Sequence, residues 1–183
     1  VNGTAQFARG LLSTSGTFYE LLEGVETGQQ RLFYGDFGVQ RDADGDTTAS
    51  LNAKMAWEQQ LDEASLLGYF VGGSFGTSDI GGTFEGSNDQ LSLEAGLYGA
   101  RKLSQNIYLD GYAALDFGLN DMALDNGVLE LDSRYNTRSF TTGVALSGVY
   151  TQTTYELRPE IALNYGKTWI GDVGFTGRAY GLT

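Results

Sequence analysis

The sequence predicts an all-β fold, an antiparallel transmembrane β-barrel with about eight strands visible and a short N-terminal helical or lumenal segment. Apolar and polar residues alternate with a period of two along successive stretches, which is the pattern of strands. Short and long connections alternate between these stretches, like the periplasmic turns and external loops of outer-membrane barrels. The polar positions also carry closely spaced charges of both signs, which suits the wall of a hydrated lumen.

The composition narrows the possible functions. The chain has 183 residues, of which 41% are hydrophobic, and this is enough for one folded domain. Nucleic-acid binding requires a stripe of basic residues. The chain has a net charge of −12 and its sequence shows no such stripe, so we expect no nucleic-acid partner. Cysteine and histidine are both absent, which removes histidine-dependent hydrolysis and the usual zinc ligands. We therefore expect no cofactor, no metal site and no enzymatic activity.

Residues 1–30 differ from the rest of the chain. Their apolar residues recur at mixed spacings of three and four, and Thr17 with Glu20 matches a helix capping box. This pattern predicts one or two helical turns over residues 17–24. We therefore assign residues 1–30 to an N-terminal linker or helical segment and residues 31–183 to the barrel.

Three alternating stretches open the expected barrel, at residues 31–40, 48–59 and 65–76. In the second of them Leu51 and Trp57 lie on one face, with polar residues opposite. Polar turns follow the first two stretches, and a loop rich in glycine, serine and aspartate is expected over residues 77–89.

A pair of alternating stretches lies within residues 90–120, on either side of a polar turn at residues 103–106. An acidic loop is then expected over residues 120–133. Its residues 121–132 could bind a partner, but a solvated external loop is the simpler interpretation. Three more strands are predicted at residues 135–150, 155–167 and 173–182. The longer connections follow the odd-numbered strands, so the first strand would run outward and leave the N-terminus on the periplasmic side.

The alternation assigns each side chain to one of two faces. The candidates for the lipid-facing side are Leu91, Leu93, Leu97, Leu109, Leu115, Leu157, Ile161 and Leu163. The candidates for the lumen-facing side are Glu94, Tyr98, Asp110, Tyr112, Asp116, Glu156, Arg158 and Glu160. Lys54, Glu58 and Arg178 fall at inward positions too, and aromatic residues near strand ends suit an interfacial girdle.

Two groups of acidic residues invite a functional interpretation. The run Asp42-x-Asp44-Gly45-Asp46 resembles a calcium loop, but Thr47 and Ala53 stand where an EF-hand needs glycine and an acid. A solvated hairpin turn is the simpler reading. The acids among the lumen-facing candidates could form a catalytic pair, but a charge network that satisfies polar groups in the lumen explains them as well.

Several segments resemble the translocator barrel of autotransporter proteins, which belong to type V secretion. They are LLGYFVGGSFG at residues 66–76, LYGAR at 97–101 and IYLDGYA at 107–113. Residues 155–165, YELRPEIALNY, are similar to the proline-bearing strand of that family. The resemblance spans about residues 31–183.

The resemblance implies a twelve-stranded barrel in the bacterial outer membrane that exports or displays an N-terminal passenger. Its implied partners are outer-membrane lipid, the passenger polypeptide and the barrel-assembly machinery. With about eight strands visible, we expect the barrel to be incomplete at its C-terminal end. The alternative hypothesis is a small closed eight-stranded outer-membrane barrel that acts as a structural anchor or adhesin. A third hypothesis is a soluble β-rich binding domain.

Overall fold

The computed structural model describes residues 2–8, 11–22, 29–151 and 155–180. Most of them form one antiparallel sheet in the order β1-β2-β3-β4-β5-β6-β7-β8-β11, with β12 also paired to β8. The strands are β1 (Asn2–Ala8), β2 (Leu11–Leu22), β3 (Gln29–Arg41), β4 (Thr47–Asp62), β5 (Ser65–Ile80), β6 (Glu85–Ser104), β7 (Ile107–Asp125), β8 (Leu129–Gly148), β9 (Tyr150–Thr151), β10 (Glu156–Leu157), β11 (Glu160–Ile170) and β12 (Phe175–Ala179). No helix in the described part of the chain is both long and apolar enough to cross a membrane.

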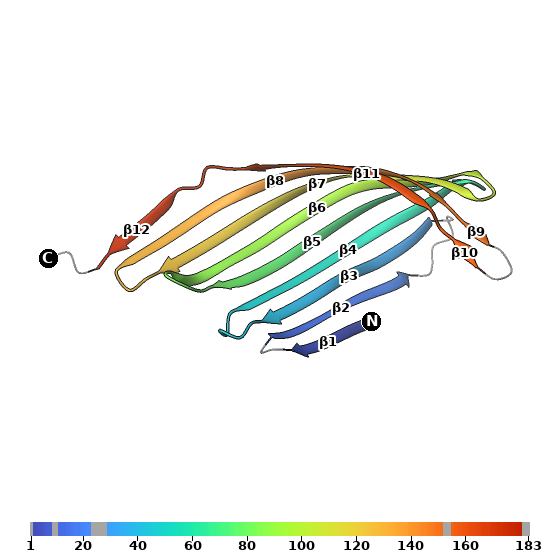
Figure 1. Cartoon of the computed structure of the whole chain (residues 1–183). Coiled ribbons are helices and arrows are strands. Elements are labelled where there is room, and N and C mark those ends of the chain that lie inside the picture. The colour runs from blue at the N-terminus through green and yellow to red at the C-terminus, as the bar shows by residue number, and fades with distance from the viewer. Residues whose placement is uncertain (1, 9–10, 23–28, 152–154, 181–183) are drawn as a thin grey trace.

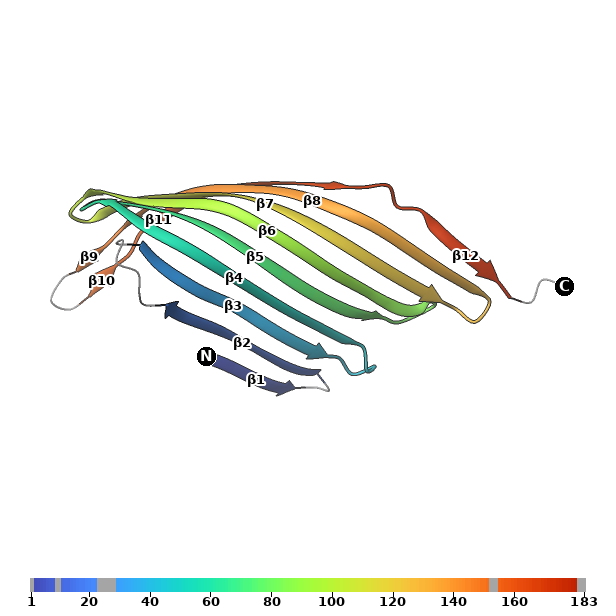
Figure 2. The same cartoon turned by 180° about the vertical axis from the view of Figure 1, so that it is seen from behind.

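The sheet is curved and open (Figures 1 and 2), with β1 along one side and β11 along the other. Within the described residues, β3 pairs with β2 and β4, and β12 pairs with β8. The first and last expected strands therefore do not meet, and the eight-stranded closure that we considered is not seen. The antiparallel, all-β prediction is confirmed.

The central strands are longer than expected. β6, β7 and β8 contain 20, 19 and 20 residues, whereas a tilted strand crosses a bilayer with about 9–11. The predicted loops at 77–89 and 120–133 are therefore wrong, because the two hairpins turn only at residues 81–84 and 126–128. Backbone ladder bonds do not depend on apolar side chains, so pairing continues into these polar segments while both arms stay in register.

The predicted helical turns near the N-terminus are also wrong. Thr17 to Leu22 lie in β2, which pairs with β1 and β3, while residues 23–28 lie outside the described part of the chain. Pairing to β3 supplies ladder hydrogen bonds along the whole of β2, and it outweighs the weak local signal of a capping box. The sheet thus extends to the N-terminal side of residue 31.

The expected strand at residues 155–167 is divided at Pro159. Glu156 and Leu157 form β10 with β9, and β11 pairs with β8 from Glu160 onward. Proline has no N–H for the ladder, although its carbonyl still accepts a hydrogen bond from the Gly148 N–H at 2.8 Å. The hairpin therefore continues through this position with one interruption.

The last expected strand, at residues 173–182, does not add a new neighbour to the sheet. β12 pairs with the same strand as β11, farther along β8, and residues 181–183 lie outside the described residues. The register changes by one between the pairs Ile170–Thr137 and Phe175–Ser133. Because one residue of slip reverses the facing, Arg178 lies opposite Glu130 and not at the inward position that we predicted.

Candidate functional site on the inner face of the sheet

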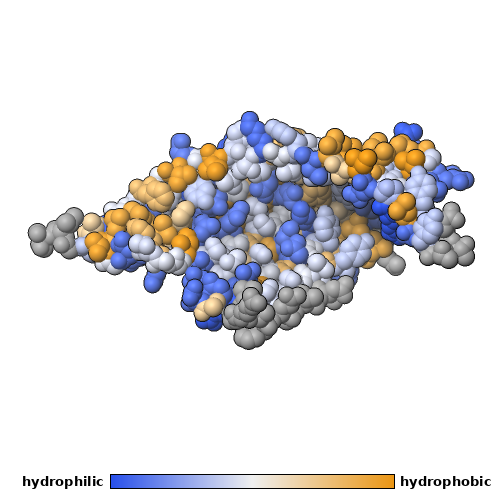
Figure 3. Space-filling model, viewed as in Figure 1, coloured by the Kyte–Doolittle hydropathy of each residue, from blue (hydrophilic) through white to orange (hydrophobic). Residues whose placement is uncertain are grey.

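Three neighbouring rows of cross-strand partners share one face of the sheet, which we call the inner face. The first row is Gln30, Glu58, Gly68, Tyr98, Tyr112, Gly143 and Asn164; the second is Leu32, Ala56, Phe70, Gly96, Ala114 and Thr141; the third is Tyr34, Lys54, Gly72, Glu94, Asp116 and Ser139. Hydrophilic and neutral residues cover the hollowed middle of the face seen in Figure 3, and hydrophobic residues gather toward its two ends.

An ion pair crosses the inner face from β4 to β6. Lys54 Nζ lies 2.5 Å from Glu94 Oε2, and the two side chains are 20% and 23% exposed. Gly72 of β5 stands between them in the register, and a Cβ added there would lie 2.7 Å from Lys54 Cγ. The absence of a side chain at Gly72 therefore lets the lysine lie flat across β5.

Two tyrosines cross a strand in the same way. Tyr98 of β6 passes over Gly68 of β5 and donates a hydrogen bond to Glu58 Oε1 of β4 at 2.6 Å. A Cβ at Gly68 would lie 2.3 Å from Tyr98 Cζ. Tyr112 of β7 likewise reaches Asn164 of β11 at 3.3 Å across Gly143 of β8. These crossings fix side chains between strands that are not neighbours.

A small apolar cluster lies between the Lys54–Glu94 ion pair and the Tyr98–Glu58 hydrogen bond. Leu32, Ala56, Phe70 and Ala114 are its buried members, and Tyr34 and Tyr98 pack against it. Lys54 Nζ lies 5.2 Å from the centre of the Phe70 ring, within cation–π range. A hollow of about 850 Å³ lies beside this cluster and is lined by the residues of both crossings. The inner face thus combines a rigid polar lining with open space.

The predicted lumen-facing residues separate into two groups. Glu94, Tyr98, Tyr112 and Asp116 lie in the three rows, and Asp110 lies on the same face nearer the short turns. The remaining three lie at the end of the β8–β11 hairpin, where Arg158 contacts Glu156 and Glu160 pairs with Ser147. No interaction in the described part of the chain connects this group to Glu94. The acids therefore lie in two separate places, and within the three rows Glu94 and Asp116 are direct cross-strand partners.

The sequence did not reveal which residues these side chains contact. Lys54 and Glu58 were expected on the inward side, but their partners on β6 depend on the register of three strands. Asn164 was not among the candidates at all, although it accepts the Tyr112 bond. The glycines at inward positions were the feature of the sequence that could have predicted these contacts, because each side chain that crosses a strand passes over a glycine.

The opposite, outer face of the sheet carries seven of the predicted lipid-facing residues, and the eighth, Leu157, lies in β10. All eight are exposed, from 37% for Leu109 to 73% for Ile161. Trp57 and Tyr69, on neighbouring strands near the short turns, stack with ring centres 5.1 Å apart. Exposed apolar surface of this extent is rare in soluble proteins and marks a surface that meets lipid or a partner.

The acidic run at residues 42–46 forms the turn between β3 and β4. Asp42 Oδ1 accepts hydrogen bonds from the N–H groups of Asp44, Gly45 and Asp46 at 2.9–3.0 Å, and Gly45 has a φ of 98°. The described residues contain no group of three or more acids arranged to hold a metal ion. The geometry is that of a turn capped by an aspartate.

The comparison with protein families agrees with this architecture. The family model described as Autotransporter beta-domain matches residues 31–183, and no curated protein matches the chain. Among solved structures, the chain is similar to BauA, the ferric preacinetobactin receptor from Acinetobacter baumannii, with 8% identity and a TM-score of 0.48. That match covers 99% of this chain and 33% of the receptor, so the chain spans about a third of the receptor's length.

Proposed function

Because the chain belongs to the autotransporter beta-domain family, we propose that it is an outer-membrane translocator or anchor that exports or displays a passenger polypeptide. The family places the protein in the bacterial outer membrane as an antiparallel β-barrel. The observation that carries the proposal is the separation of the two faces along one curved sheet. Exposed leucines line the outer face, and paired charges line the inner face.

The ends of the sheet support an orientation in the membrane. Two-residue turns at 63–64 and 105–106 lie at one end, and the longer connections at 42–46 and 81–84 lie at the other. Outer-membrane barrels place short turns in the periplasm and longer loops outside. On this basis the end with residues 42–46 faces the exterior, and we call it the loop end.

The inner face suits passage of a polypeptide better than catalysis. The Lys54–Glu94 pair and the Tyr98–Glu58 bond hold polar side chains flat against the sheet. The inner face is therefore polar, and these side chains do not project into the lumen through which a polypeptide would pass. We propose lipid on the outer face and the passenger on the inner face as partners, with the barrel-assembly machinery needed for insertion. The proposal requires no bond-breaking step and no cofactor.

An export assay tests the proposal. A protease-sensitive reporter is fused to the N-terminal side of the chain and expressed with an export signal in a Gram-negative host. We expect the chain to fractionate with the outer membrane, to shift in mobility on heating, and to present the reporter to protease added outside the cells. A chain that folds as a monomer in detergent-free buffer, or a reporter that stays protected, would refute the proposal.

The export assay needs a matched pair of variants. Leu115 faces the bilayer, and an arginine on the lipid-facing side costs roughly 2–4 kcal/mol of folding free energy near the bilayer centre. Leu115→Arg should therefore reduce the amount of folded barrel. Asp116→Ala, one residue along the same strand, removes an inner-face carboxylate and should leave folding and display nearly unchanged. The reverse order of effects would mean that the two faces are assigned wrongly.

A further inference from the structure

The outer face changes character on β8 and β11 as these strands approach the loop end. On β8 the last apolar outward residue before Arg138 is Phe140. On β11 the outward apolar run ends at Tyr165 and is followed by Lys167. Both basic side chains are exposed. Two cations thus stand at the border between apolar and polar surface in a chain whose net charge is −12.

The register places these two cations close together. Arg138 lies directly opposite Trp169, and Lys167 lies directly opposite Phe140. Arg138 and Lys167 are therefore diagonal neighbours on adjacent strands, a separation of roughly 7–8 Å between Cα atoms. Lys167 Nζ lies 4.8 Å from the centre of the Trp169 ring, so an interfacial aromatic residue adjoins the basic pair.

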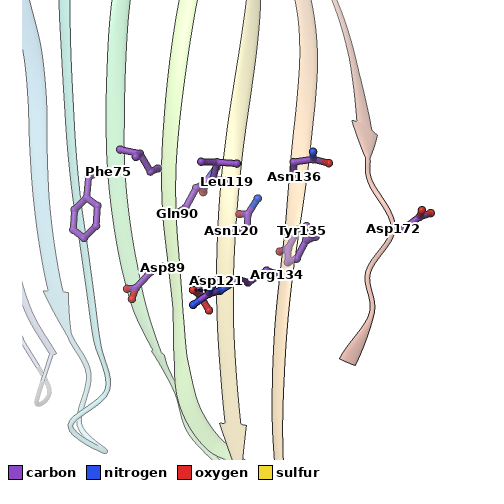
Figure 4. Close-up of a pocket in the computed structure, with 11 residues that line it drawn as sticks. Phe75, Asp89, Gln90, Leu119, Asn120, Asp121, Arg134, Tyr135, Asn136 and Asp172 are labelled. Atoms are coloured by element: carbon purple, nitrogen blue, oxygen red, sulfur yellow. Dashed lines mark hydrogen bonds and ion pairs between the residues drawn. The ribbon is translucent and has the colours of Figure 1, made fainter. Parts of the chain in front are cut away.

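Other basic residues near the loop end lie beside acids. Arg134 Nε lies 2.8 Å from Asp121 Oδ2, and both line a hollow of about 710 Å³ with Asp89 and Asp172 (Figure 4). Arg178 lies opposite Glu130 in the register. Arg138 and Lys167, by contrast, form no ion pair with any described residue, and the cross-strand partners of both are aromatic.

We propose that Arg138 and Lys167 bind a phosphate group of an anionic glycolipid in the outer leaflet of the membrane. This inference rests on the proposed function, because it requires the loop end to face the exterior. Guanidinium groups bind phosphate through two parallel hydrogen bonds, and an ammonium adds a point charge. Long basic side chains beside a lipid-facing band reach the headgroup layer, where tryptophan is also favoured.

The test uses protein extracted from outer membranes with a mild detergent and native mass spectrometry. The probes are lipid A carrying two phosphates and the same lipid after enzymatic dephosphorylation. Each basic residue near an anionic surface contributes about a fivefold increase in binding. We therefore expect Arg138→Gln with Lys167→Gln to weaken retention of phosphorylated lipid at least tenfold and to leave dephosphorylated lipid unaffected.

Two controls keep the test decisive. Arg101→Gln removes an exposed outward cation near the short turns and should not change retention. Exchange of the two residues, Arg138→Lys with Lys167→Arg, should preserve most of the retention of phosphorylated lipid. If the neutral variant with both glutamine substitutions fails to fold, the comparison of the two lipids on the wild type decides, and the wild type must prefer the phosphorylated lipid. Equal retention of both lipids by the wild type, equal retention by the neutral variant, or retention of a second protein copy in place of lipid would overturn the inference. Failure of the proposed function would instead appear as absence from the outer membrane.

Discussion

Tyr98 and Glu58 form a 2.6 Å hydrogen bond although they lie on β6 and β4, with β5 between them. The bond exists because Gly68 leaves the surface of β5 open beneath the tyrosine ring. The Lys54–Glu94 pair crosses β5 four residues away by the same means, over Gly72. Glycines on the inner face therefore determine which polar groups can meet.

We predict that Gly68→Ala destabilises the barrel by about 1–3 kcal/mol, the usual cost of overpacking. The new methyl group would occupy the space of the Tyr98 ring and would break its bond to Glu58. Equilibrium unfolding in urea, followed by the mobility shift on heating, measures the loss.

Gly76→Ala is the matched control, because Gly76 lies on the same strand and face, and its nearest neighbour would be 3.8 Å from the new Cβ. This variant should remain within about 0.5 kcal/mol of the wild type. Equal stability of the two alanine variants would show that the crossing at Gly68 is unimportant.

A second prediction concerns the Lys54–Glu94 ion pair. Lys54→Met keeps the aliphatic stem but leaves the Glu94 carboxylate without its partner, so it should cost about 1.5–3 kcal/mol. Adding Glu94→Gln to it should recover part of this loss, because no unpaired charge then remains. A double-mutant cycle measures the coupling, and strictly additive effects would contradict a direct interaction.

The acidic turn at the loop end should respond to pH. Burial of its carboxylate, together with Asp42 and Asp79 nearby, raises the pKa of Asp46 above its usual value. An acid with a raised pKa stabilises the folded state below the usual aspartate pKa of about 3.9, and this contribution is lost as pH rises through the raised pKa. The 42–46 turn should therefore open more readily at neutral pH than at pH 3.

Amide hydrogen exchange of Gly45 and Thr47, corrected for intrinsic rates, measures this opening. Asp46→Asn should remove the pH dependence and slow exchange at neutral pH, and added salt should weaken the effect in the wild type. Faster exchange at pH 3 than at pH 7 in the 42–46 turn would contradict the assignment.

Much of the fold follows from alternation alone. A period of two assigns every strand residue to a face without knowledge of its neighbours, so the exposed leucines and the inward position of Glu94 were predictable. The family resemblance rested on the same strands, and the family match confirms it. Local patterns were less reliable where pairing decided the outcome, as at Thr17, which lies in a strand despite its capping-box signal.

Register and interruptions could not be read from the sequence. The contact between Tyr98 and Glu58 depends on two successive pairings, each fixed by a different hairpin. The register change between Ile170 and Phe175 places Arg178 on the outer face. No local residue pattern predicts this change. Strand length was also hidden, because polar segments pair as well as apolar ones when their hairpin partner is in register.

The most direct test of the account measures the surroundings of two neighbouring side chains. The chain contains no cysteine, so Leu115→Cys and Asp116→Cys each give one site for a nitroxide spin label in the membrane-embedded protein. Residue 115 lies on the outer face and residue 116 on the inner face. We predict that the label at 115 collides mainly with lipid-soluble oxygen and the label at 116 with a water-soluble nickel chelate. A label at 115 that meets the nickel chelate, or neither reagent, would contradict a lipid-facing outer surface.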